Sequence, residues 1–122
     1  MKILISGGCE KPNYEEIALA LDRLQRREKQ ECLETKRPFE LTLILGGPHL
    51  TDALAQRWAF LGGIPVLRIE TNSWFYGRAA ESVRASWLMK TTVPDVVLSL
   101  PGDEVAPIIT LAQAYNMPVV TI

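Results

Sequence analysis

The stretch Leu43-Ile44-Leu45-Gly46-Gly47-Pro48-His49-Leu50-Thr51-Asp52-Ala53-Leu54-Ala55 decides the fold of this chain. A short apolar run ends in two glycines, and a short polar segment then leads into an amphipathic segment. This order predicts a buried strand, a tight turn and the start of a helix, an arrangement in which α/β proteins hold ligands. The same order occurs at 3–8 and, less regularly, at 96–103. Three such turns in one small chain predict a single pocket built from strand ends.

Apolar runs alternate with helical patterns along the whole chain. The runs are rich in Ile, Val and Leu with little polar alternation, which predicts parallel strands covered on both faces. We expect strands at 2–6, 41–46, 64–69, 95–99 and 118–122, and helices at 14–30, 50–61, 76–90 and 104–115. The 122 residues are therefore expected to form one domain, residues 1–122, with a doubly wound α/β sheet of about five parallel strands and helices on both faces.

Helical spacing also predicts which residues enter the core. In the second expected helix, the apolar stripe comprises Leu50, Ala53, Leu54, Trp58 and Leu61. Trp58 is expected to be structural for this reason, as is Trp87 in the third helix. The stretch 23–40 carries most of the interleaved charge, which predicts either a solvated helix end running into a loop or a charged docking surface.

Composition excludes several classes of protein. A formal net charge of −1 argues against broad binding to nucleic acid or to anionic membranes, which needs a surplus of Lys and Arg. No apolar run approaches the roughly 20 residues of a membrane span, and the apolar run at 3–5 is too short for a signal peptide. Cys9 and Cys32 lack CxxC spacing. We therefore expect a reduced, cytoplasmic protein.

Several short motifs follow one another in a fixed order: Gly7-Gly8, Gly46-Gly47 with 52–55, Trp74 with 76–80, Arg84, 94–97 and Pro101-Gly102. In order and spacing they resemble the YspA-type, cpYpsA-related branch of the SLOG superfamily, which also holds the lonely-guy-type phosphoribohydrolases and the DprA Rossmann domain. The resemblance covers nearly the whole chain. It implies a Rossmann-like fold and a pocket for a nucleotide or a nucleotide-derived ligand.

The chain departs from the family pattern in three places. Residues 46–52 take the place of the usual GGARGAD-like turn, but they lack its arginine and one of its glycines. The usual Arg-Asn pair is replaced by Arg84-Ala85. Residues 101–106 take the place of the usual PGGxGT loop. In this loop Asp103 and Glu104 place carboxylates near the expected position of a phosphate. Without a cation, these carboxylates would repel a phosphate. The ligand is therefore shifted or less negatively charged there, or the ancestral activity is lost.

Candidates for ligand binding lie at strand ends or in the family motifs: Gly7, Gly8, Gly46, Gly47, Asp52, Trp74, Tyr76, Arg78, Arg84, Pro101 and Gly102. Glycines let the backbone approach a ligand, although the same glycines also suit plain strand-to-helix turns. The aromatic pair could sandwich a base or pack under a loop. An arginine fork could bind a phosphate or carboxylate, or form an internal salt bridge.

Three residues are candidates for catalysis. His49, the single histidine, follows the second strand and could act as a general base or be a polar loop residue. Asp52 matches the family aspartate, and it could bind a ribose hydroxyl or cap a helix. Glu10 could supply a carboxylate for cleavage of an N-glycosidic bond. The residue types and spacing predict no metal site, and no cofactor is expected.

The leading function predicted from these residues is binding of a nucleotide or nucleotide-derived small molecule at the carboxyl edge of the sheet. One alternative is a hydrolase of the N-glycosidic bond of nucleosides or nucleotides. Another is a structural or interaction protein whose pocket has decayed. The third expected helix carries Val83, Trp87 and Leu88 beside polar residues, which predicts a homodimer or higher oligomer.

Overall fold

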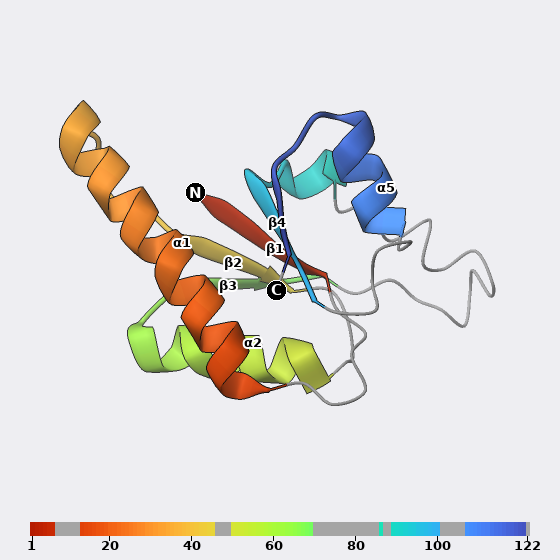
Figure 1. Cartoon of the computed structure of the whole chain (residues 1–122), viewed down its shortest axis with the longest axis horizontal. Coiled ribbons are helices and arrows are strands. Elements are labelled where there is room, and N and C mark those ends of the chain that lie inside the picture. Colours follow the sequence, from red (N-terminus) through yellow and green to blue (C-terminus); the bar gives the residue numbers. More distant parts are fainter. Residues whose placement is uncertain (7–12, 46–49, 70–85, 87–88, 101–106, 122) are drawn as a thin grey trace.

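The computed structural model describes residues 1–6, 13–45, 50–69, 86, 89–100 and 107–121. Five strands form one all-parallel sheet in the order β3-β2-β1-β4-β5 (Figure 1). The strands are β1 (Lys2–Ser6), β2 (Thr42–Leu45), β3 (Val66–Arg68), β4 (Val96–Ser99) and β5 (Val119–Thr121). The predicted α/β class with five parallel strands is therefore confirmed, and each strand lies within its predicted range.

Helices cover both faces of this sheet. They include α1 (Tyr14–Thr35), α2 (Leu50–Gly62) and α5 (Pro107–Ala114), together with helical residues at 86 and 89–92. The helices α1 and α2 share a hydrophobic core with one face of the sheet, and α5 and Met89 share a second core with the other face (Figure 1). Among the described helices, none is long and apolar enough to cross a membrane.

Residues of the central strands alternate between these two cores. In β1, Ile3 and Ile5 face the core of α1 and α2, whereas Leu4 faces the core of α5. In β2, Leu43 likewise faces one core and Ile44 the other, and all of these side chains are buried. Since both faces are covered, the strands need apolar residues at every position, which explains their lack of polar alternation.

Helix α1 begins where its sequence provides a cap. The side chain of Asn13 accepts a hydrogen bond of 2.9 Å from the backbone N–H of Glu15. The helix ends at Lys36, which has a left-handed φ of 56°. The sequence predicted an end near residue 30, but the buried stripe continues through Glu28 and Cys32. The dense charge between these positions obscured the stripe.

Helix α2 packs through a face that differs from the predicted one. Trp58 is in the core as expected, and its Nε1 donates a 2.9 Å hydrogen bond to Asp22 Oδ1 of α1. However, Ala53 is exposed and Leu61 is 67% exposed, so their predicted places in the apolar stripe are wrong. Ala55 and Ala59 are fully buried instead. These small residues let the helix approach its neighbours closely, and the resulting rotation also buries the first turn of the helix.

Candidate functional site

The carboxyl ends of β1 and β4 lie side by side at the centre of the sheet. Each strand ends in a serine, and Ser6 and Ser99 are register partners. Both serines are buried, and the backbone N–H of Leu100 donates a 3.0 Å hydrogen bond to the carbonyl of Ser6. The order of strands reverses between β1 and β4, so the two serines flank the topological switch point. Open α/β sheets bind their ligands at this point.

The first turn of α2 adds two buried polar side chains. Asp52 is 2% exposed and Thr51 is fully buried. The N-terminal turn of a helix carries partial positive charge, which stabilises a carboxylate such as that of Asp52. Within the described part of the chain, the hydroxyl of Thr51 has no hydrogen-bond partner. Such a hydroxyl costs free energy when it is buried, so this position is not optimised for stability alone.

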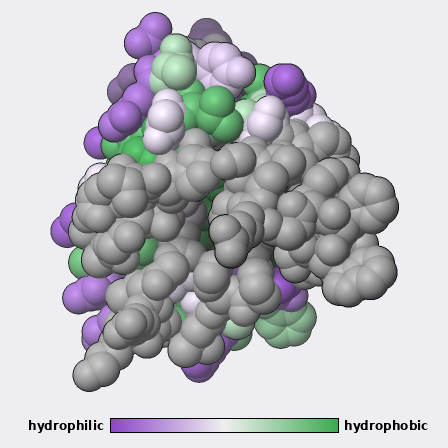
Figure 2. Space-filling model, turned by 90° about the vertical axis from the view of Figure 1, so that its right-hand side faces the viewer, coloured by the Kyte–Doolittle hydropathy of each residue, from purple (hydrophilic) through white to green (hydrophobic). Residues whose placement is uncertain are grey.

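The helices bring their N-termini to the same side of the sheet. In Figure 1 the strands β1, β2 and β4 point toward the side on which α2 and α5 begin. Figure 2 views the molecule from that side, and the described residues visible around its margins are both hydrophilic and hydrophobic. This edge therefore combines buried hydroxyls, a buried carboxylate and the positive ends of two helices, a set of groups suited to a polar ligand.

Asp52 is the one candidate residue from the sequence that lies in the described part of the chain. It is buried in the first turn of α2, the helix that follows β2 and begins on the side of the sheet where the strands end. The remaining candidates lie outside the described residues, and they stay predictions: Gly7, Gly8, Glu10, Gly46, Gly47, His49, Trp74, Tyr76, Arg78, Arg84, Pro101 and Gly102. The same holds for the predicted oligomer contacts Val83, Trp87 and Leu88.

Sequence reasoning missed the polar residues Ser99 and Thr51 as parts of this edge. A usable signal existed for the strands. In a strand covered on both faces every side chain is buried, so a hydroxyl at the last position is exceptional, and both β1 and β4 end in one. For Thr51 the signal was weaker, because its burial depends on how α2 rotates against the sheet.

The described residues include no group of three His, Cys, Asp or Glu side chains that could hold a metal ion. No family model, curated protein or solved structure matches this chain. The resemblance to the SLOG superfamily therefore rests on the order of motifs in the sequence alone.

Proposed function

We propose that this chain binds a nucleotide or nucleotide-derived small molecule at the carboxyl edge of its sheet, as a diverged SLOG-type protein. The observation that carries the proposal is the buried carboxylate of Asp52 in the first turn of α2, which begins on the side of the sheet where β1 and β4 end in the buried, paired Ser6 and Ser99. The motif order supports the same ligand class, since Asp52 matches the family aspartate.

The chemistry of these groups suits the sugar of a nucleoside. An ionised carboxylate only accepts hydrogen bonds, so Asp52 would accept from ribose hydroxyls, whereas serine hydroxyls can donate or accept. The resemblance assigns Trp74 to the base and Arg84 to an anionic group. Asp103 and Glu104 add negative charge to the loop that would otherwise hold a phosphate. We therefore expect nucleosides to bind at least as well as their monophosphates.

The direct test is calorimetric titration of the chain with adenosine, cytidine, their monophosphates, ADP-ribose and NAD. At least one of these compounds is expected to bind, and Asp52→Asn should weaken that binding by about tenfold or more. Glu15→Gln, which removes one exposed carboxylate at the start of α1, is the matched control and should bind normally. Absence of binding by every compound at millimolar concentration would overturn the proposal.

A second assay separates binding from catalysis. A phosphoribohydrolase of the lonely-guy kind relies on its glycine-rich loop to position the sugar, and positioning contributes several kcal/mol to lowering a barrier. Because the loop at 101–106 departs from that pattern, we expect little or no release of free base from adenosine or cytidine monophosphate. Robust base release that disappears in Asp52→Ala would replace the binding function with an N-glycosidic hydrolase.

A further inference from the structure

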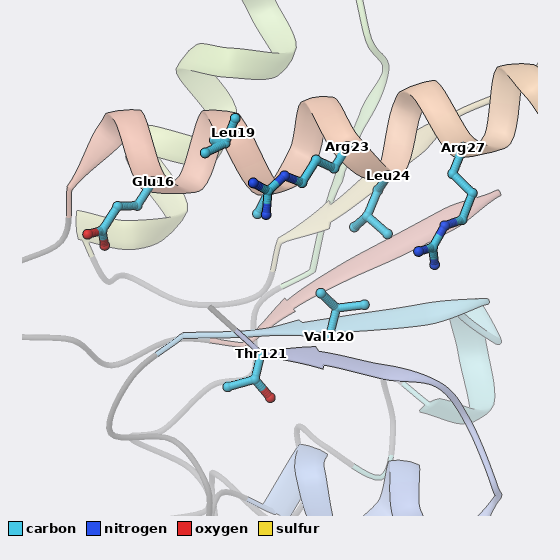
Figure 3. Close-up of a pocket in the computed structure, with 8 residues that line it drawn as sticks. Glu16, Leu19, Arg23, Leu24, Arg27, Val120 and Thr121 are labelled. Atoms are coloured by element: carbon cyan, nitrogen blue, oxygen red, sulfur yellow. The ribbon is translucent and has the colours of Figure 1, made fainter.

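A groove of about 450 Å³ separates α1 from the edge strand β5 (Figure 3). Leu24 and Val120 point toward each other across it and form an apolar floor. Charged side chains of α1 line the groove along its length, with Glu16 near the start of the helix and Arg27 near the other end. The groove is therefore apolar at its base and oppositely charged at its two ends.

This part of the sheet has less cover than the rest of the same face. The helices α1 and α2 pack together and bury the side chains of β1 and β2 that face them, Ile3, Ile5, Leu43 and Leu45. Val120 of β5 belongs to the same core but is only partly buried. Among the described residues, no second helix lies beside α1 over β5. The groove thus offers one apolar slot alongside α1.

Apart from Arg23, which falls opposite the small side chain of Ala20, the residues of α1 that line the slot are complementary to themselves in the antiparallel direction. A two-fold axis passing between Leu21 and Asp22 places Glu16 of one helix opposite Arg27 of another, so opposite charges meet at both ends. The same axis places Leu19 opposite Leu24. Leu19 is 49% exposed, so it is available to insert into the apolar floor of a neighbouring copy.

We propose that this groove is the docking site for a second copy of the chain, with the two α1 helices packed antiparallel around a two-fold axis. An isologous interface requires a patch that complements itself, and the stripe of Glu16, Leu19, Leu24 and Arg27 meets that requirement. A uniformly acidic partner would suit Arg23 and Arg27 but would face the like charge of Glu16, whereas a second copy presents an arginine to Glu16 and a glutamate to Arg27. The arrangement of charge therefore favours a second copy.

Light scattering after size exclusion, at loading concentrations from about 1 to about 100 micromolar, tests whether the dimer exists. We expect a mass that rises with concentration toward twice 13.6 kDa. A mass that stays at 13.6 kDa throughout this range would overturn the proposal and leave the groove to another partner. This outcome is independent of the ligand titration, so the two proposals fail separately.

Charge reversal then tests the surface itself. Glu16→Arg and Arg27→Glu each place like charges opposite one another twice in the dimer, and each should raise the dissociation constant by about tenfold or more. The double variant restores opposite charges and should return the constant to within about threefold of the original. Glu15→Arg and Arg26→Glu make the same charge changes at exposed positions outside the groove, and they should have little effect.

A matched pair of leucine variants tests the apolar contact between the two copies. Leu19→Ser should weaken the dimer, whereas Leu33→Ser should not, because Leu33 is 79% exposed on the same helix and does not line the groove. A dimer that tolerates both charge reversals and Leu19→Ser would use another surface, which would overturn the proposed one.

Discussion

The two ends of the sheet both bury polar side chains, but they do so in different ways. Beyond the amino ends of the strands, where α1 ends, Glu28 is 7% exposed. It accepts a 3.5 Å hydrogen bond from Cys32 Sγ and lies 3.6 Å from Arg37 Nη2. At the carboxyl end, Ser6, Ser99 and Asp52 are buried and come from β1, β4 and α2.

The difference lies in where the partners come from. Glu28, Cys32 and Arg37 belong to one helix and the residues directly after it, so this cluster holds the end of α1 together. The backbone N–H of Arg37 also donates a 2.9 Å hydrogen bond to the carbonyl of Cys32. At the carboxyl end, Ser6 and Ser99 lie side by side only because the sheet pairs β1 with β4, and Asp52 is on a third element whose N-terminus lies on the same side of the sheet. Local clusters of this kind serve stability, whereas convergence from several elements is typical of a binding site.

Arg37→Ala should have the largest effect on stability in the local cluster. It removes the cation nearest to a buried carboxylate, and we expect the free energy of unfolding to fall by about 1 to 2 kcal/mol in urea titrations. Adding Glu28→Gln should recover most of the loss, because the amide carries no charge. Ligand affinity at the other end should not change. A loss of nucleotide binding in Arg37→Ala would contradict the division between the two ends.

Thr51→Val should act in the opposite direction. It replaces the buried hydroxyl of Thr51 with a methyl group of similar size, and we expect stability to rise by about 1 kcal/mol. Thr35→Val is the matched control at the end of α1. Its hydroxyl donates a 2.8 Å hydrogen bond to the carbonyl of Glu31, so this change should lower stability or leave it unaltered.

The same Thr51→Val variant sharpens the assignment of the carboxyl edge. If its hydroxyl is retained for a ligand, the stabilised variant should bind that ligand more weakly in the calorimetric titration. Equal or tighter binding together with higher stability would show that Thr51 takes no part in the site. The role of Asp52 is tested separately, by the titration of Asp52→Asn.

The smallest expected effect is a pH dependence at Cys32. Burial, followed by the hydrogen bond to Glu28 and the charge of Glu28, raises the pKa of this thiol above its ordinary value of 9.0. Above that pH the unfolded chain loses the thiol proton before the folded chain does, so the free energy of unfolding should fall as pH rises toward the higher native pKa.

Urea titrations at about pH 8 and about pH 10 measure this effect. Both the reference protein and its Cys32→Ala variant should carry Cys9→Ser, so that one thiol alone differs between them. The fall in stability between the two pH values should be steeper with Cys32 present. Equal slopes would show that the thiol is not protected by the fold.

Much of the fold could be predicted because its signals are local. Unbroken apolar runs mark strands that are covered on both faces, and five such runs became five parallel strands. The core position of Trp58 was also predicted from its helical spacing. Of the candidate site residues, Asp52 alone lies in the described part of the chain, where it is buried as part of α2, and all the other candidates lie outside the described residues and remain predictions.

The sequence alone thus determined the α/β class and the approximate position of each strand and each described helix along the chain, because side-chain patterns within a few residues decide these features. Only the tertiary structure decided that Ser6 lies against Ser99, that Asp52 is buried rather than solvated, and that a groove stays open beside α1. Strand adjacency and helix rotation depend on contacts between distant segments. The close packing of Ala55 and Ala59, rather than the exposed Leu61, sets the face that α2 buries.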